Sequence, residues 1–322
     1  MFDVVALGEL LIDFTPAGYS ASGNVLFERN PGGAPANVLV ALTMLGGKGA
    51  FIGKVGDDQF GHFLKGVLGE RGIDTRGLRF SSEANTTLAF VHLDERGDRS
   101  FSFYRNPGAD TLLRAEEVDF GLVDEARIFH FGSLSMTHEP ARSATLAAVK
   151  YAKESGKIVS YDPNWRPPLW QDDAAAREGM SLGLKFADVL KLSEAELGFI
   201  TGEPDLDRGS KKLLEMGISL VVVTLGPKGC YYRCPSGTGQ LPTYDTRVVD
   251  TTGAGDAFMG ALLFHISRME YSLQELDRPE VERMLDFSNA AGALCASKKG
   301  GIPAMPTIDE VVSCMRNVPK LG

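Results

Sequence analysis

The 322-residue sequence predicts one α/β domain over residues 1–322, in which a doubly wound, mostly parallel sheet lies between two layers of helices. It also predicts a small β lid. Two patterns support this fold class. Short apolar runs alternate with helix-length segments along most of the chain, which is typical of a parallel sheet covered on both faces. The alternation stops once, where two strand-like segments follow each other with only a polar turn between them.

The chain begins with units of strand and helix. The apolar run at residues 4–7 is short and continuous, as expected of a strand buried on both faces. Pro35 favours the start of a helix that continues through 38–45, because proline is tolerated in the first helical turn. A strand at 50–55 and a helix at 60–70 follow, with Asp57 or Asp58 as the N-cap of this helix.

The predicted lid comes from two segments. Residues 86–94 and 99–104 are predicted strands, joined by the tight polar turn 95–98. Because no helix separates them, they form an antiparallel hairpin inserted in the α/β series. Together, residues of about 10–32 and 78–107 are expected to build a small sheet that projects from the main domain and closes over a ligand.

Regular alternation returns in the second half of the chain. Strands are predicted at 128–131, 158–161, 189–192 and 220–224, and helices at about 140–155, 173–186, 194–201 and 207–216. A further pair of strands at 229–233 and 241–246 precedes an apolar helix at 257–266, and helices at about 280–297 and 307–317 close the chain. This alternation extends the parallel sheet.

Composition excludes several classes of protein. The chain is 43% hydrophobic and 23% charged, which is ordinary for a globular protein, and its net charge of −9 argues against nucleic acid or an anionic membrane as partner. The four cysteines form no CxxC pair, and the histidines show no metal-ligand spacing. The N-terminus has no basic leader segment and no apolar run reaches membrane-spanning length, so we expect a cytoplasmic protein.

Two common nucleotide-binding motifs are missing. The spacing of Gly56 and Gly61 approaches that of a P-loop, but His62 and Phe63 follow where lysine and a hydroxyl residue are required. The segment 237–239 lacks the third glycine of a dinucleotide fingerprint. A nucleotide would therefore have to bind in another way.

The most informative stretch is Asp-Thr-Thr-Gly-Ala-Gly-Asp at residues 250–256, directly before the apolar helix. Gly253 and Gly255 allow backbone conformations that direct successive N–H groups at one point, and a helix N-terminus favours an anion there. Asp256 then lies in the first helical turn, beside the anion pocket, where a carboxylate is suited to take a proton from an attacking hydroxyl. The alternative interpretation is a glycine turn with an aspartate cap.

This stretch resembles the C-terminal signature of the ribokinase-like carbohydrate kinases, the phosphofructokinase B family. The resemblance covers Gly8 to Pro306, with the motifs in the order of the family. It implies the ribokinase-like fold and an ATP-dependent sugar kinase. It also implies that Asp256 is the catalytic base and that the amides of Gly253, Ala254 and Gly255 form the anion hole.

The N-terminal part carries a candidate sugar site. Carboxylates and amides recognise polyol hydroxyls because they accept and donate hydrogen bonds at fixed geometry. Asp13 by itself is also compatible with a strand-end residue bonded to a turn. With Gly32, Gly33 and Asn37, however, it resembles the sugar-binding signature of the family, and Gly-Gly-Ala-Pro-Ala-Asn is similar to fructokinases, whereas ribokinases tend to carry a lysine in this motif.

Two arginines are candidates for binding anionic groups. Arg105 ends the lid hairpin, and Arg166 follows a buried strand in the sequence Asp-Pro-Asn-Trp-Arg-Pro. Each offers a planar donor fork for phosphoryl or carboxylate oxygens, although each is equally compatible with a surface ion pair. We assign both to the substrate, and Arg166 also to the transferring group. The context of Arg166 resembles fructokinases and 2-keto-3-deoxygluconate kinases alike.

The resemblance also implies a nucleotide site. The strand 220–224 leads into a glycine turn, which alone is compatible with a plain strand-to-hairpin connection, and Ser193 with Glu196 is compatible with a capping box. In the family, these segments bind ATP. The implied ATP contacts are Lys191, Ser193, Glu196, Thr224, Gly226, Gly229, Gly253, Gly255 and Asn289. Ser193 stands where the family usually has asparagine, and Glu196 is expected near the Mg²⁺.

A monovalent cation, K⁺, is implied by the same resemblance. Its ligands in the family are mostly carbonyl oxygens, which leave almost no side-chain pattern. The matching residues are Asp250, Thr252, Cys295, Lys298, Gly300 and Ala304. Taken alone, the last four describe the end of a helix with the usual basic and glycine residues.

The resemblance thus implies a fructokinase that converts D-fructose to fructose 6-phosphate with ATP, Mg²⁺ and K⁺. The alternatives are 2-keto-3-deoxygluconate kinase and another sugar or nucleoside kinase of the ribokinase family. A non-catalytic sugar sensor is disfavoured, because Asp256 and both glycines of the signature are intact. We further expect a homodimer that binds neither nucleic acid nor membrane.

Overall fold

A nine-stranded sheet forms the centre of the computed structural model, which describes residues 1–93, 99–270 and 272–322. Its order is β13-β12-β11-β10-β9-β8-β1-β4-β5. The strands are β1 (Phe2–Leu7), β4 (Gly49–Gly56), β5 (Asp74–Ser81), β8 (Ala126–Gly132), β9 (Ile158–Asp162), β10 (Val189–Ser193), β11 (Leu220–Thr224), β12 (Cys230–Cys234) and β13 (Gly237–Leu241). Neighbouring strands are parallel from β5 to β11, and β12 and β13 are added in antiparallel fashion.

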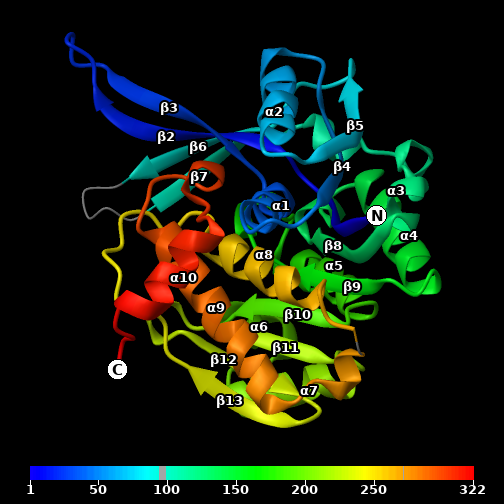
Figure 1. Cartoon of the computed structure of the whole chain (residues 1–322). Helices are drawn as coiled ribbons and strands as arrows, with labels where there is room; N and C mark the ends of the chain where they lie inside the picture. The colour runs from blue at the N-terminus through cyan, green and yellow to red at the C-terminus, as the bar shows by residue number, and fades with distance from the viewer. Residues whose placement is uncertain (94–98, 271) are drawn as a thin grey trace.

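Helices cover both faces of this sheet (Figure 1). One layer contains α1 (Ala34–Met44), α2 (Gln59–Glu70), α8 (Ala254–Ile266), α9 (Arg278–Ala296) and α10 (Ile308–Asn317). The other contains α3 (Phe120–Asp124), α4 (Ala141–Glu154), α5 (Asp173–Leu184), α6 (Glu194–Thr201) and α7 (Leu206–Glu215). In β1, Val4 faces the first layer and Val5 the second, so both faces of the strand are apolar. The predicted three-layer, doubly wound fold class is confirmed.

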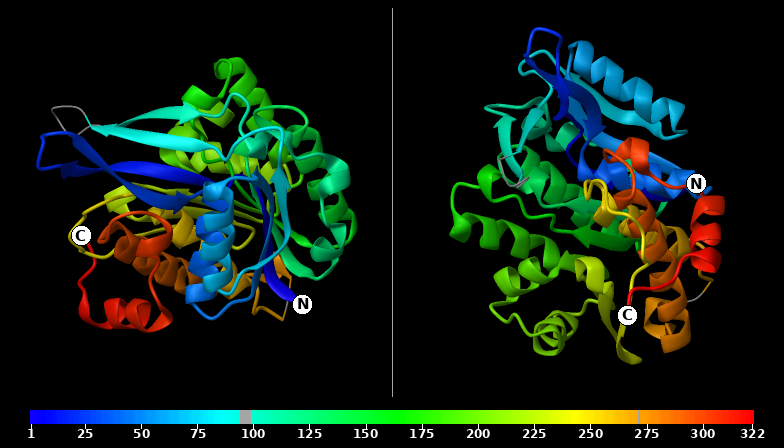
Figure 2. Two further views of the ribbon diagram at one scale, coloured as in Figure 1. Left: turned by 90° about the horizontal axis from the view of Figure 1, so that it is seen from above. Right: turned by 90° about the vertical axis from the view of Figure 1, so that its left-hand side faces the viewer.

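A second sheet has four strands in the order β3-β2-β6-β7. They are β2 (Leu11–Tyr19), β3 (Val25–Gly32), β6 (Leu88–Leu93) and β7 (Arg99–Tyr104). β2 and β3 form one antiparallel hairpin, β6 and β7 form the other, and β2 pairs with β6 in parallel. Both hairpins project beyond the main body (Figures 1 and 2). We call this small sheet the lid sheet.

Three details differ from the prediction or lie outside it. The predicted turn 95–98 falls outside the described residues. β5 belongs to the main sheet, so the lid-sheet strands of the second segment begin after it, at β6. The predicted strand at 241–246 is wrong, because β13 ends at Leu241. Pro242 follows and has no N–H with which to continue the ladder.

The topology places a ligand site where the chain reverses its direction of winding. From β1 the sheet extends through β4 to one side and through β8 to the other. Ligands of open parallel sheets bind beyond the carboxyl ends of the strands at such a switch point. The residues that follow β1, β8 and β9 are therefore candidates for a ligand site.

The helices α1 and α8 approach closely at Gly260. A Cβ atom added to this glycine would lie 2.6 Å from the Ala41 Cβ and 2.6 Å from the Val38 carbonyl oxygen. Glycine therefore lets the two backbones meet in the core. The contact holds the N-terminal turns of α1 and α8 side by side, and these turns carry Asn37 and Asp256.

Replacing Gly260 by alanine should lower the free energy of unfolding by about 1–3 kcal/mol, although alanine favours helix, because the added methyl overpacks a backbone contact. Gly66→Ala in α2 is the matched control. An added Cβ at Gly66 meets no described atom within 4 Å, so stability should rise by up to about 1 kcal/mol. Urea unfolding measures both changes. If both substitutions changed the free energy of unfolding in the same direction, the packing argument would be contradicted.

Candidate active site

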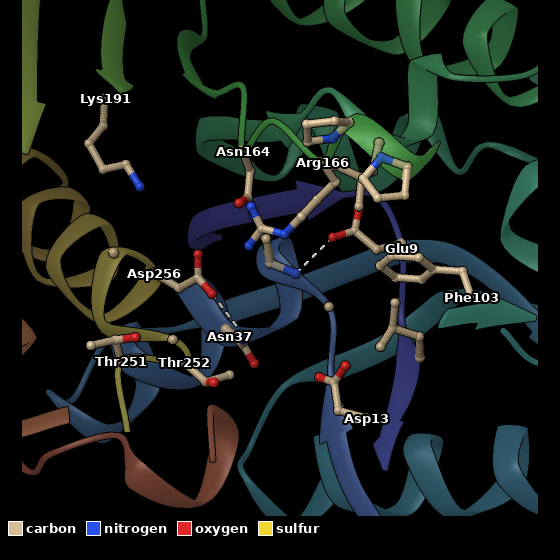
Figure 3. Close-up of a pocket in the computed structure, with 18 residues that line it drawn as sticks. Glu9, Asp13, Asn37, Phe103, Asn164, Arg166, Lys191, Thr251, Thr252 and Asp256 are labelled. Carbon is tan, nitrogen blue, oxygen red and sulfur yellow. Dashed lines mark hydrogen bonds between the residues drawn. The ribbon is translucent and has the colours of Figure 1, made fainter. Parts of the chain in front are cut away.

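A cavity of about 730 Å³ lies at the carboxyl ends of the central strands (Figure 3). Its residues come from the lid sheet, from the starts of α1 and α8, from the segments that follow β1, β8 and β9, and from β10. They are Glu9, Leu11, Asp13, Gly33, Ala34, Asn37, Phe103, Leu134, Asn164, Arg166, Pro167, Pro168, Lys191, Thr251, Thr252, Gly253, Gly255 and Asp256. Segments far apart in the sequence thus form one site.

Asp256 lies in the first turn of α8 and is buried against Asn37. The Asn37 Nδ2 group donates a 2.8 Å hydrogen bond to Asp256 Oδ2 (Figure 3). Burial raises the pKa of Asp256, while Lys191, the Asn37 hydrogen bond and Arg166 oppose this rise. A fixed carboxylate in a cavity, with a pKa moved upwards, has the properties of a general base.

The turn before α8 has the geometry of an anion site. Gly253 is the N-cap residue in a left-handed conformation, with φ of 78°. The amides of Gly255 and Asp256 follow in the first helical turn, where N–H groups have no acceptor within the helix. A Cβ on Gly255 would lie 3.0 Å from the Lys191 Nζ atom, so this ammonium group stands next to the start of the helix.

Lys191 is held by a buried carboxylate. Its Nζ atom lies 2.6 Å from Asp162 Oδ2, and both side chains are almost completely buried. Burial by itself lowers the pKa of the Lys191 ammonium group. The nearby carboxylates of Asp162, Asp256 and Glu196 raise this pKa by more, so the net shift is upward. The Asp162 pKa is raised to about 7 by burial, against the opposing effect of Lys191. This cation is thus kept at the entrance to the anion site.

The predicted sugar-binding residues meet on the lid side of the cavity. Asp13 on β2 faces the cavity together with Gly33 and Asn37. Gly33 has a φ of 116°, and a Cβ there would overlap the Glu9 carbonyl oxygen, so only glycine fits. Gly32 pairs with Leu11 and lies against the Asp13 carboxylate. Burial raises the pKa of Asp13 to about 7, and Arg166 opposes this.

The two arginines are placed differently. Arg166 lines the cavity, and its Nη1 atom donates to the Trp165 carbonyl oxygen at 3.1 Å. Arg105 is not among the residues that line this cavity. Its buried guanidinium pairs with Asp110 at 2.6 Å and also donates to Thr137 and to the Leu134 carbonyl. In this structure Arg105 is thus engaged by neighbouring residues outside the cavity lining, and the prediction that it contacts the substrate stays a prediction.

The predicted nucleotide residues lie beyond Lys191 along the same edge of the sheet. Ser193 and Thr224 are neighbours in register at the ends of β10 and β11. The turn after Thr224 contains Gly226 and Gly229, both with positive φ. Asn289 on α9 is buried and donates to the Pro242 carbonyl at 3.3 Å.

Glu196 caps α6 and reaches across to the segment after β9. Its Oε2 atom accepts from the Ser193 backbone N–H at 2.7 Å, and its Oε1 atom accepts from the Trp165 N–H at 2.6 Å. The capping box that the sequence allowed is present. The carboxylate therefore joins the corner of β10 and α6, where predicted nucleotide residues lie, to the segment that follows β9.

Most of the residues assigned to K⁺ come together near the start of α8. The Asp250 carboxylate accepts from the Thr252 N–H at 2.8 Å and from the Gly300 N–H at 3.0 Å, so it ties the two loops to each other. Cys295 Sγ lies 3.6 Å from the Thr252 carbonyl. The Lys298 ammonium group instead pairs with Glu310 at 2.7 Å. Ala304 ends a short 3₁₀ turn in the same segment.

Several lining residues had not been predicted as site residues. Glu9, Phe103 and Asn164 line the cavity, although no sequence motif assigns them to a site. Asn164 is the only non-glycine residue with positive φ (50°) in the described chain, which marks a locally constrained turn. A polar residue placed directly after a buried strand, as Glu9 is, was the available sequence signal. In the part of the chain that the structure describes, no group of three His, Cys, Asp or Glu side chains is arranged to hold a metal ion.

A nine-stranded α/β sheet, a lid sheet, and a carboxylate beside a helix N-terminal anion site define the architecture of a sugar kinase. The pfkB family carbohydrate kinase model matches residues 1–308, and the chain belongs to this family. The predicted family is thereby confirmed. Among the described residues, no helix is both long enough and apolar enough to cross a membrane.

Known relatives agree with this classification. The chain is 47% identical to fructokinase-2 of Zea mays, over 95% of this chain and 91% of that protein, and 46% identical to a probable fructokinase-2 of Arabidopsis thaliana, over 97% and 95%. A fructokinase from Xylella fastidiosa with bound ATP superimposes with a TM-score of 0.91 at 35% identity, covering 98% and 99% of the two chains. A Vibrio cholerae fructokinase with fructose, ADP and calcium gives 0.87 at 33%, covering 97% and 98%, and a variant of it has been solved with potassium.

Replacing Asp13 by asparagine should flatten the pH dependence of stability. The Asp13 pKa is about 7 in the folded protein against an ordinary value of 3.8, so the folded state holds the proton more tightly. That contribution is fully present below about pH 4 and is lost as the pH rises through about 7. Urea unfolding between about pH 5 and pH 8 should therefore show a larger loss for the wild type than for Asp13→Asn. Parallel losses in both proteins would refute this.

Proposed function

We propose that this protein is an ATP-dependent fructokinase that transfers the γ-phosphoryl group to the 6-hydroxyl of D-fructose. The observation that carries the proposal is the hydrogen bond between Asn37 and Asp256. It joins a sugar-side residue to the candidate base, directly beside the helix N-terminal anion site. The fructokinase relatives, two of them with bound ATP or with fructose and ADP, support the choice of both substrates.

Each residue of the site has a separate proposed role in phosphoryl transfer. Asp256 takes the proton of the attacking hydroxyl, and Asn37 keeps its carboxylate in position. The amides from Gly253 to Asp256 stabilise charge on the transferring phosphoryl group, with Lys191 and Arg166 as cations at the same cavity. Phosphoryl transfer depends mainly on such positioning and electrostatics.

Two ions would complete the site. Mg²⁺ would neutralise charge on the ATP phosphates, and Glu196 is the carboxylate assigned to that region. K⁺ would be held by carbonyl oxygens of the loops that Asp250 ties together, since this carboxylate fixes both loops through their N–H groups. We also propose that ATP contacts the other residues assigned to it, which are Lys191, Ser193, Thr224, Gly226, Gly229, Gly253, Gly255 and Asn289. The other residues proposed for the K⁺ site are Thr252, Cys295, Lys298, Gly300 and Ala304.

The lid sheet is proposed to close over the bound sugar. Asp13 and Phe103 project from it into the cavity, so a movement of the sheet would change access to the reacting hydroxyl. Closure would exclude water, which competes with the sugar for the phosphoryl group.

The electrostatics favour a neutral ketose over 2-keto-3-deoxygluconate. Three carboxyl groups, of Glu9, Asp13 and Asp256, line the cavity. A substrate carboxylate would lie among these acids, the cavity's cations Arg166 and Lys191 are assigned to the transferring phosphoryl group, and Arg105 is already engaged by Asp110. Hydroxyl groups, in contrast, are good donors to carboxylates.

The purified protein should phosphorylate D-fructose with a higher kcat/KM than 2-keto-3-deoxygluconate or D-ribose, measured by ADP formation over a panel of sugars. Asp256→Asn should lower kcat for fructose by a factor on the order of 10² or more, with little change in ATP binding, because the general base is removed. A higher kcat/KM for 2-keto-3-deoxygluconate than for fructose would instead identify the keto acid as the substrate. Near-wild-type turnover of Asp256→Asn would eliminate its role as base.

We further propose that the protein is a cytoplasmic homodimer joined through the lid sheets. All four cysteines are free thiols, in keeping with a reducing compartment. The lid sheet exposes Tyr19, Val25, Leu26, Phe27 and Tyr104, a concentration of large apolar side chains suited to a second copy of the same surface.

Light scattering should give twice the chain mass of 34.7 kDa for the wild type. Phe27→Asp should shift the protein towards the mass of one chain, because it places a charge in the apolar interface. Met216→Asp, at an exposed apolar residue of the main domain, is the control and should keep the wild-type mass. A wild type that is monomeric at all concentrations rejects the dimer.

A further inference from the structure

Glu9 is a buried acid at the cavity that the proposed mechanism does not use. It follows β1 at the switch point of the sheet, is 2% exposed, and lines the cavity. Its Oε1 atom accepts a 2.8 Å hydrogen bond from the Ala34 N–H, the first residue of α1 (Figure 3). One carboxylate oxygen therefore fixes the turn of Gly33 and Ala34.

The other oxygen has no such partner. Glu9 Oε2 is buried and, within the described chain, accepts or donates no hydrogen bond. The nearby Arg105 guanidinium does not satisfy it, because it is occupied by Asp110, Thr137 and the Leu134 carbonyl. A buried carboxylate oxygen without a partner costs free energy, and a ligand hydroxyl in the cavity would satisfy it.

Holding the turn does not by itself require an acid. A glutamine at this position would offer the same acceptor to the Ala34 N–H without burying an ionisable group. The second oxygen therefore demands another explanation. Asp13 and Asp256 reach the same cavity from the lid sheet and from α8, so Glu9 completes a set of acceptors on different sides of the space (Figure 3).

We propose that Glu9 is a specificity-determining residue for the sugar, with Oε2 hydrogen-bonded to a hydroxyl other than the one that is phosphorylated. The inference rests on the proposed fructokinase activity and names a further residue of that site. Glu9 also positions the Gly33 turn through Oε1, so a single side chain sets both the backbone and one hydroxyl of the ligand. Burial raises the pKa of Glu9 to about 7, and above that pH the side chain is an anion whose Oε2 atom accepts from the hydroxyl.

The test is Glu9→Gln, which keeps the size of the side chain and an acceptor for the Ala34 N–H but replaces Oε2 by an amide nitrogen. For D-fructose, kcat/KM should fall roughly 10- to 100-fold, the loss usual for a hydrogen bond to a charged group, while the KM for ATP and the melting temperature stay near wild type. Glu117→Gln, at an acid paired with Lys54 outside the cavity, is the matched control and should leave the fructose KM unchanged.

A series of sugars identifies the hydroxyl. Wild type and Glu9→Gln are compared on D-fructose, 2,5-anhydro-D-mannitol, 1-deoxy-D-fructose, 3-deoxy-D-fructose and 4-deoxy-D-fructose. The sugar that lacks the hydroxyl bound by Glu9 should be a poor substrate for the wild type and should lose little more in the variant. An equal loss for all five sugars, or no loss for fructose, overturns the proposal and leaves Glu9 a structural residue.

The wild-type measurements separate this inference from the proposed function. A wild type that phosphorylates none of these sugars overturns the fructokinase assignment, and the role of Glu9 falls with it. If the wild type is active and the Glu9→Gln variant has the same kcat/KM for D-fructose, only the role of Glu9 is overturned. Should Glu9→Gln fail to fold, Glu9→Asp gives the same test, because it keeps the acid but withdraws it by one methylene group, and the same pattern across the sugars is expected.

Discussion

The close contact of α1 with α8 at Gly260 is the constraint on which the site depends. Because an added Cβ would meet the Ala41 side chain and the Val38 carbonyl, the two helices can approach only where this residue is glycine. Their first turns then lie together, and Asn37 reaches Asp256 at 2.8 Å. The core packing of two apolar helices therefore sets the geometry between the candidate sugar site and the candidate base.

Buried acids line the cavity or, in the case of Asp162, lie behind its Lys191 side chain, although burial normally penalises such groups. The pKa values of Glu9, Asp13 and Asp162 are each raised to about 7 by burial. Lys191, paired with Asp162 at 2.6 Å, brings a compensating cation to the start of α8. Replacing buried charged groups by apolar ones is often neutral or stabilising, so the presence of these acids is consistent with the ligand-binding roles proposed above.

The sequence predicted the fold class and indicated a candidate base because both depend on local patterns. Asp250–Asp256 is a contiguous turn that feeds an apolar helix, so Asp256 could be assigned without knowing any tertiary contact. Arg105 could not be placed this way, since its acceptors Leu134 and Thr137 lie 29 and 32 residues further along the chain and meet it only in the folded structure. Glu9 was missed for a related reason, because its burial and its unpartnered oxygen follow from packing against α1.

Glu196 has a consequence for how the two substrates affect each other. Its carboxylate accepts from the Trp165 N–H at 2.6 Å and the Ser193 N–H at 2.7 Å, so the segment with Arg166 and the corner of β10 and α6 are joined. If the two substrates bind to these elements as proposed, the first one to bind would order both, and the second would meet a lower entropic cost. Thermodynamic linkage then requires each substrate to raise the affinity for the other by the same factor. Cooperativity between nucleotide and sugar would thus arise within a single subunit.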